Sequence, residues 1–158
     1  MATAGKNLSF YDKASLPDAR NFKIGLVVSE WNSEITEALF DGAELTLLDC
    51  KVEKKNIIRL NVPGSFELPL GCKRMILEEK VDAVVAIGSL IQGETKHFDF
   101  VCSATAQGIM DVNLQLDIPV IFCVLTDNTF QQAKDRSGGK HGNKGAEAAI
   151  AAIKMVSR

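Results

Sequence analysis

Short apolar runs alternate with longer stretches of mixed character along most of the chain. An unbroken apolar run is typical of a strand covered on both faces, whereas apolar residues at helical spacing indicate an amphipathic helix. The runs that predict strands span residues 24–28, 57–62, 83–87 and 119–125. The stretches that predict helices span residues 33–49, 67–80, 97–116, 129–137 and 143–157. Ser33 is the expected N-cap of the first helix.

The order of these elements predicts the architecture. Strands that alternate with helices form a parallel sheet with right-handed crossovers, and helices then cover both faces. We therefore expect an α/β fold, a three-layer αβα sandwich whose four-stranded parallel sheet has flavodoxin-like topology. Residues 1–22 are polar, contain Pro17 and show no sustained periodicity. They predict an N-terminal arm ahead of a single domain at residues 23–158.

Composition and charge exclude several classes of partner. The apolar fraction of 46% and the charged fraction of 24% are ordinary for a globular protein. A net charge of −2, with acids and bases interspersed, argues against binding to nucleic acid or to an anionic membrane. No apolar run approaches the ~20 residues that cross a bilayer, and a secretory signal is not expected. The four cysteines are far apart, which favours reduced thiols in the core of a cytoplasmic protein.

The carboxyl ends of the predicted strands carry candidate binding residues, and ligands of open α/β sheets bind at this edge. After the third strand, residues 88–99 include His97 at an expected helix start, where backbone N–H groups attract anions. After the first strand, Trp31 can stack on a planar ring while Asn32 offers a donor and an acceptor. After the second strand, residues 65–67 present amides and side chains at another helix start.

A cationic break separates the last two predicted helices. Arg136 and Lys140 lie beside two glycines there, and the planar fork of an arginine suits a phosphate group. Glu147 follows one helical stretch later and is expected to hold that fork. The chain lacks the glycine signatures of nucleotide-binding loops, the ligand spacing of a metal site and a serine nucleophile elbow. Taken singly, each candidate motif is also compatible with a capped turn or a solvated surface group.

Together, the strand-end motifs resemble one protein family, the 6,7-dimethyl-8-ribityllumazine synthases. The segments that carry the resemblance are Trp31-Asn32, PGSFE (63–67), GSLIQGETKHFD (88–99), PVIF (119–122) and RSGGKHGNKG (136–145). They occur in the family's order and spacing, from about Lys23 to the C-terminus. Five motifs in register are far more specific than any one of them.

The resemblance implies a transferase of riboflavin biosynthesis that works without a metal or an organic cofactor. Its reaction condenses 5-amino-6-(D-ribitylamino)uracil with 3,4-dihydroxy-2-butanone 4-phosphate and releases phosphate and water. His97 matches the family's proton donor. The residues that match its phosphate site are Glu94, Thr95 and Arg136. Those that match its uracil site are Trp31, Asn32, Ser65, Phe66, Glu67, Ser89, Leu90, Ile91 and Phe122. Those expected in supporting roles are Lys140, Lys144 and Glu147.

The resemblance also implies a homo-oligomer, because active sites of the family lie between neighbouring chains. We expect a pentamer, and the short link at residues 138–142 is similar to that of members forming a shell of sixty subunits. Riboflavin synthase is a further expected partner. Two alternatives stay open. A receiver-type regulator would need more acids at the first strand end than Glu30 alone, and an inactive shell-former or riboflavin carrier would share the sequence motifs.

Overall fold

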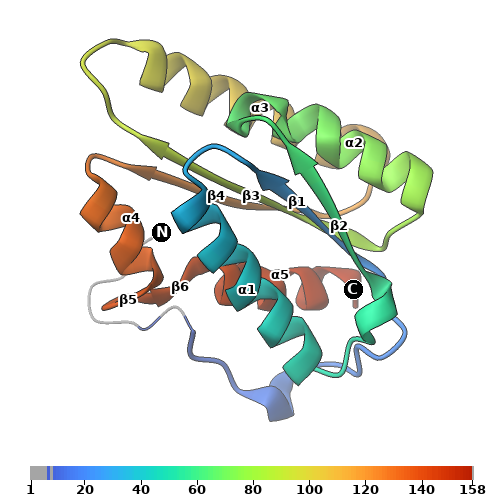
Figure 1. Cartoon of the computed structure of the whole chain (residues 1–158). Coiled ribbons are helices and arrows are strands. Elements are labelled where there is room, and N and C mark those ends of the chain that lie inside the picture. Colours follow the sequence, from blue (N-terminus) through green and yellow to red (C-terminus); the bar gives the residue numbers. More distant parts are fainter. Residues whose placement is uncertain (1–6, 8, 158) are drawn as a thin grey trace.

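The centre of the molecule is a sheet of four parallel strands, seen in a computed structural model that describes residues 7 and 9–157. The strands are β1 (Ile24–Ser29), β2 (Ile57–Val62), β3 (Ala83–Ile91) and β4 (Val120–Asp127). They lie in the order β2-β1-β3-β4, so β1 and β3 are the central pair (Figure 1). The predicted four-stranded parallel sheet with flavodoxin-like topology is confirmed.

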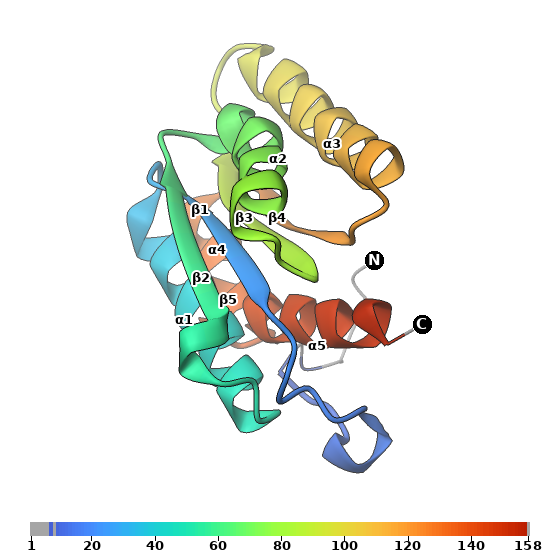
Figure 2. The same ribbon diagram turned by 90° about the vertical axis from the view of Figure 1, so that its right-hand side faces the viewer.

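Helices cover both faces of this sheet. The pair on one face is α1 (Ser33–Asp49) and α5 (Lys144–Val156), and the pair on the other is α2 (Leu68–Glu79) and α3 (His97–Leu116). Figure 2 shows the three layers, with the sheet between the two helix pairs. The shorter α4 (Phe130–Arg136) follows the end of β4. The predicted three-layer αβα sandwich is therefore confirmed.

Each face of the sheet has its own apolar core, which explains the unbroken apolar runs. All six residues of β1 are buried, because successive side chains enter opposite cores. Leu26 and Val28 belong to the core beneath α1 and α5, whereas Val27 belongs to the core beneath α2 and α3. A strand covered on both sides has no polar face, so its sequence shows no alternation.

The cysteines divide between core and surface. Cys72 and Cys123 are fully buried, as the sequence predicts, and burial raises the pKa of the Cys123 thiol to about 12. Cys50 is partly buried and packs against the core beneath α1 and α5, whereas Cys102 is only partly buried and the core prediction is wrong for it.

Two strands continue past their predicted ends. The apolar run of the third strand stops at Ile87, yet β3 continues to Ile91, and β4 accompanies it as far as Asp127. A glycine is required within this extension, because a Cβ at Gly88 would lie 2.7 Å from the Ser65 hydroxyl. The β1 strand pairs with β3 only as far as Ile87. The last part of β3 therefore has β4 alone as a strand neighbour.

The start of α1 differs from the prediction at its cap. Asn32, not Ser33, occupies the N-cap, in a left-handed conformation with φ 58° and ψ 47°. Its side chain does not cap the helix, because the Asn32 amide instead donates a hydrogen bond of 2.8 Å to the Ser89 carbonyl oxygen. Asparagine and serine are similarly favoured at an N-cap, so local preference does not decide between these neighbours, and the Asn32 side chain makes a tertiary contact instead.

An unpredicted β-hairpin joins α4 to α5. Its strands are β5 (Ser137–Gly139) and β6 (Gly142–Asn143), and two of its glycines adopt positive φ. Asn143 holds the hairpin in place, since its amide donates to the carbonyl oxygens of Ala38 in α1 and Ser137 at 2.8 and 3.2 Å. The Asn143 carboxamide oxygen also accepts from the Gly145 N–H at 2.8 Å and so caps α5. The hairpin is thus tied to both helices.

The described part of the N-terminal arm contacts the ends of α1 and the hairpin. The arm includes the 3₁₀ turn η1 (Lys13–Ser15), and another such turn, η2 (Lys54–Asn56), precedes β2. The Tyr11 hydroxyl donates to Asp49 Oδ2 at 2.5 Å, and burial together with this bond raises the pKa of Tyr11 to about 12. The Ser9 hydroxyl accepts from the Asn143 N–H at 2.9 Å. Residues 1–6 and 8 of the predicted arm lie outside the described residues.

Candidate functional site

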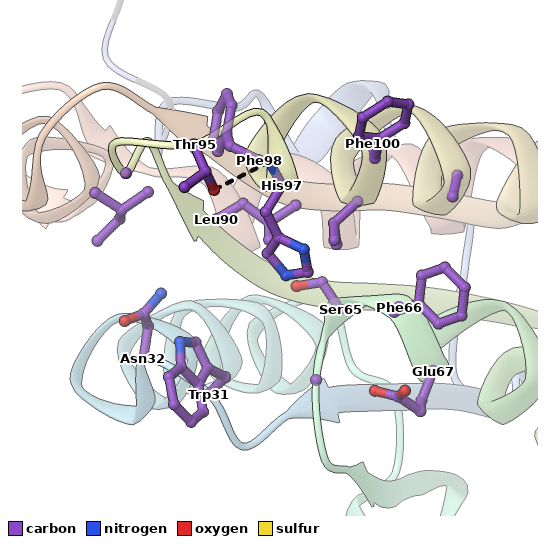
Figure 3. Close-up of a pocket in the computed structure, with 15 residues that line it drawn as sticks. Trp31, Asn32, Ser65, Phe66, Glu67, Leu90, Thr95, His97, Phe98 and Phe100 are labelled. Carbon is purple, nitrogen blue, oxygen red and sulfur yellow. Dashed lines mark hydrogen bonds between the residues drawn. The ribbon is translucent and has the colours of Figure 1, made fainter.

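A pocket of about 910 Å³ lies at the carboxyl ends of the central strands (Figure 3). From β1 the chain passes to β2 on one side of the sheet and then to β3 on the other, and such a switch point is where ligands bind in open α/β sheets. Most of the predicted site residues line this pocket. They are Trp31, Asn32, Ser65, Phe66, Glu67, Leu90, Ile91, Thr95 and His97.

The turn after β1 places an aromatic ring at the rim of the pocket. Trp31 is 71% exposed, although it lines the pocket. The left-handed backbone at Asn32 turns the chain into α1, and asparagine tolerates this conformation better than most residues. The hydrogen bond from Asn32 to Ser89 ties the turn to β3, beyond the point where β1 stops pairing. The indole ring is thereby held where its face can meet a flat ligand.

The turn after β2 supplies a second aromatic ring and a carboxylate. It forms the 3₁₀ turn η3 (Ser65–Glu67), which leads into α2 with Pro69 in the first helical turn, as expected. Ser65 is buried, and its carbonyl accepts a hydrogen bond of 3.2 Å from the Thr105 hydroxyl of α3. Phe66 is by contrast 60% exposed, and both its ring and Glu67 line the pocket. This turn offers an apolar surface beside a hydrogen-bond acceptor.

His97 begins α3 on the opposite wall. Figure 3 shows its imidazole directed across the pocket toward Ser65. The His97 N–H donates to the Thr95 hydroxyl at 3.3 Å, where the chain turns into the helix. The N–H groups of a first helical turn have no partners within the helix, and they attract anions. Thr95 lines the pocket, whereas the exposed Glu94 does not.

The end of β3 forms the floor between these walls. Ser89 is fully buried and contributes its carbonyl oxygen to the contact with Asn32. Leu90 and Ile91 follow it, are partly buried and line the pocket. The motif that contains these residues reads as a loop in the sequence. Its first four residues are in fact strand, which fixes their main-chain groups more firmly than a loop would.

Phe122 and Arg136 lie away from this pocket. Phe122 is 38% exposed on β4, which is an edge strand of the sheet. Arg136 ends α4, where its Nη1 atom donates to the Gln132 carbonyl at 2.9 Å and lies 3.5 Å from Asp127 Oδ1. Neither residue lines the pocket that its own chain forms. The predicted site therefore divides within one chain into a pocket and a separate group around β4 and α4.

The motifs and the pocket agree with the comparison to known sequences. The profile described as 6,7-dimethyl-8-ribityllumazine synthase matches residues 21–158. The chain belongs to this family. Curated relatives of that name include one from Christiangramia forsetii, 65% identical over 99% of this chain and 94% of the relative. Another, from Flavobacterium johnsoniae, is 65% identical over 99% of this chain and 82% of the relative. A third, from Porphyromonas gingivalis, is 50% identical over 99% of this chain and 97% of the relative.

Membership of the lumazine synthase family decides one of the two alternatives that the sequence left open. The resemblance inferred from five motifs is confirmed, and the chain is an enzyme of a transferase family. A receiver-type regulator is therefore wrong. An inactive member that only assembles or carries riboflavin would share the same profile, so activity has to separate that alternative.

The residues expected in supporting roles form ion pairs with residues nearby in the same chain. Lys144 Nζ lies 2.5 Å from Glu147 Oε1, three residues further along the same face of α5. Within one chain Arg136 faces Asp127, so the expected contact of Glu147 with Arg136 is not formed there. Lys140 likewise pairs with an acid of α4, at 3.1 Å. Lys144 and Lys140 thus each pair with an acid close in sequence, and Arg136 lies near an acid at the end of β4.

Several further residues complete the pocket that the sequence did not identify as site residues. They are Gly64, Gly93, Phe98, Phe100, Val101 and Ala104. Those from α3 share its first two turns, and a helix that starts at a ligand-binding edge presents those turns to the ligand. Across residues 7 and 9–157, no three His, Cys, Asp or Glu side chains gather as a metal site would require. In the same stretch no helix is long and apolar enough to cross a membrane.

Proposed function

We propose that this enzyme condenses 5-amino-6-(D-ribitylamino)uracil with 3,4-dihydroxy-2-butanone 4-phosphate to give 6,7-dimethyl-8-ribityllumazine, phosphate and water. The reaction is the penultimate step of riboflavin biosynthesis, takes place in the cytoplasm and uses no metal or organic cofactor. One observation carries the proposal: three strand-end turns converge on one pocket in a chain whose family is named for this product. These turns bring stacking, hydrogen-bonding and proton-transfer groups together from separate motifs.

The uracil substrate binds in the pocket in this proposal. Trp31 stacks on the ring, because an exposed indole at a rim offers a flat apolar face. The ribityl chain lies along Asn32 and residues 65–67, whose polar groups match its hydroxyls. The pyrimidine edge meets Leu90, Ile91 and the main chain that follows Ser89. The rigidity of β3 supports this assignment.

Proton transfer falls to His97. The 5-amino group adds to the ketone, and loss of water gives an imine. Elimination of phosphate, tautomerisation and attack by the ribitylamino nitrogen, with loss of a second water, then close the second ring. Each step moves a proton, and an imidazole can donate and accept protons near neutral pH. Holding both substrates in one orientation is the larger contribution, since it converts a bimolecular step into an effectively unimolecular one.

Phosphate binds between two chains in this proposal. Thr95 and the main chain at Glu94 approach it from one chain, at the start of α3. Arg136 and Phe122 approach from a neighbour, with Lys140, Lys144 and Glu147 in support. The separation of these residues from the pocket of their own chain favours this arrangement. A carboxylate at residue 94 would repel phosphate, so the backbone N–H and not the side chain makes the contact.

The assembly we propose is a pentamer, with twelve pentamers forming a shell of sixty subunits. Large apolar side chains are exposed on the outer helices, and a monomer in solution rarely leaves such surface uncovered. They include Leu70, Leu77, Phe100, Met110 and Leu114. Light scattering of the purified protein distinguishes a monomer, a pentamer and a shell. Riboflavin synthase is the further partner to test by co-purification with that assembly.

The direct test of the reaction uses the purified protein and both substrates. Lumazine formation is followed by fluorescence, and phosphate release is measured in parallel. The proposal expects one phosphate for each lumazine formed. Tight binding of riboflavin without turnover would instead identify an inactive carrier.

Replacing His97 with alanine should slow turnover by about a hundredfold without abolishing it. General acid–base catalysis contributes about 10²- to 10⁴-fold, and the lower end applies where substrate orientation supplies most of the acceleration. Steady-state kinetics measure kcat for the variant. His141→Ala is the matched control, because His141 is the only other histidine in the chain and lies in the hairpin link. Equal effects in both variants would remove the assignment.

A further inference from the structure

Asp127 is a buried carboxylate that its surroundings satisfy poorly. It ends β4 and is only 7% exposed. Its Oδ1 atom lies 3.5 Å from Arg136 Nη1, a long distance for a charged pair, and its Oδ2 atom is buried without a hydrogen-bond partner among the described residues. Burial raises the pKa of Asp127, the charge of Arg136 opposes this rise, and the charge of Asp135 adds to it. A buried carboxylate held this loosely is destabilising and calls for a functional explanation.

Hydrogen bonds restrain the positions of both Asp127 and Arg136. The Asp127 carbonyl accepts a hydrogen bond of 3.0 Å from the Gln92 N–H, and Asp127 pairs with Ile91 in the β3–β4 ladder. Arg136 is restrained because its Nη1 atom donates to the Gln132 carbonyl at 2.9 Å. Both contacts of the guanidinium use Nη1, and the side chain keeps 30% exposure. Part of the fork therefore remains accessible to a ligand while a fixed carboxylate lies behind it.

The charged side chains nearest to Asp127 and Arg136 form an ion pair with each other. Asp135 of α4 pairs with Lys140 at 3.1 Å and accepts a hydrogen bond of 3.0 Å from Gln131. These contacts lower the pKa of Asp135, so it stays ionised and balances Lys140. Within the described structure, Asp127 is the acid that faces Arg136. The local charge that a phosphate meets at Arg136 therefore depends mainly on Asp127.

We propose that Asp127 tempers the affinity of Arg136 for phosphate and thereby lets inorganic phosphate leave after the reaction. The inference rests on the proposed function, in which Arg136 binds the phosphate of the ketone substrate. An uncompensated guanidinium would hold the substrate phosphate and the released phosphate alike, because both offer the same charged oxygens. A fixed carboxylate behind the fork weakens both complexes, and product release limits turnover in many enzymes. Asp127 acts through Arg136 and is a positioning residue in this sense.

The test replaces Asp127 with asparagine, which keeps the shape and one oxygen but removes the charge. Inorganic phosphate is used as a competitive inhibitor of the full-length, assembled enzyme. Its inhibition constant should fall by roughly fivefold to tenfold, and the Michaelis constant for the ketone phosphate by a similar factor. The Michaelis constant for the uracil substrate should not change. Added salt should reduce the effect, which a loss of packing alone would not show.

Two controls keep the result interpretable. Asp117→Asn removes an exposed acid that precedes β4, at the far end of that strand, where φ of 53° suits asparagine, and phosphate inhibition should be unchanged. Thermal unfolding and light scattering establish that each variant is folded and assembled. If Asp127→Asn fails to fold, Asp127→Ser removes the same charge with a smaller side chain and repeats the measurement.

The outcomes separate this inference from the proposed function. An unchanged or higher inhibition constant in Asp127→Asn overturns the tempering role. Arg136→Ala is measured in the same assay. If it leaves phosphate inhibition unchanged, the proposed phosphate role of Arg136 fails. If it weakens phosphate inhibition while Asp127→Asn does not strengthen it, only the inference about Asp127 fails.

Discussion

Arg136→Ala is expected to raise the Michaelis constant for the ketone phosphate by about tenfold to a hundredfold. Hydrogen bonds to a charged group contribute about 1.5–3 kcal/mol, and each 1.4 kcal/mol corresponds to about a factor of ten. The Michaelis constant for the uracil substrate should stay within about twofold, since the proposed uracil contacts come mainly from other residues. Steady-state kinetics with each substrate varied in turn measure both constants.

Arg136→Lys is the informative companion to this variant. Lysine keeps the positive charge but loses the planar fork that can bind two phosphate oxygens at once. Its effect on the same Michaelis constant should fall between those of the native enzyme and Arg136→Ala. An Arg136→Ala enzyme that uses the ketone phosphate normally would contradict the role assigned to this residue.

Gly145→Ala should lower the free energy of unfolding by about 3 kcal/mol or more. A Cβ at Gly145 would lie 1.9 Å from the carbonyl oxygen of Leu39 and 2.8 Å from its carbonyl carbon. Both are backbone atoms of α1, so no side-chain rotation relieves the clash. The start of α5 must move away from α1 instead, and that movement also strains the contacts of Asn143 with Ala38.

Urea unfolding of both variants of a matched pair tests this expectation. Gly93→Ala is the control, because no heavy atom lies within 4 Å of a Cβ built there. Its free energy of unfolding should differ from the native value by less than about 1 kcal/mol. Equal stability of the two variants would mean that α1 and α5 do not approach each other as closely as described.

Most of the fold could be predicted because each strand and helix leaves a local signature. The run at residues 24–28 is apolar throughout since β1 enters two cores, and the helices show one buried stripe each. Errors collect where long-range contacts decide the outcome. Ser33 and Asn32 have similar local capping chemistry, and Asn32 takes the N-cap while its amide bonds to Ser89 on another element.

Many of the residues that line the pocket could be predicted, whereas the separation of Phe122 and Arg136 from that pocket could not. Motifs at strand ends identify Trp31, residues 65–67 and His97, because parallel strands bring their carboxyl ends to one edge. Ion pairing followed no such rule: the predicted strand stops at residue 125, and only the extension of β4 to Asp127 places this carboxylate behind Arg136. A pair formed by a strand end and a helix end has no fixed spacing in sequence.

The end of β3 at the pocket is open on one side because β1 is shorter than β3. Beyond Ile87, β3 keeps β4 on one side, while on the other side the chain of β1 has turned away and Asn32 takes the Ser89 carbonyl. The amide edge of a uracil alternates donors and acceptors much as a peptide backbone does. A pyrimidine bound there, as proposed, completes the sheet in the manner of a missing strand. Recognition of the heterocycle then depends, in this proposal, on main-chain groups of β3 that lie beyond the end of its pairing with β1, as well as on the side chains around the ring.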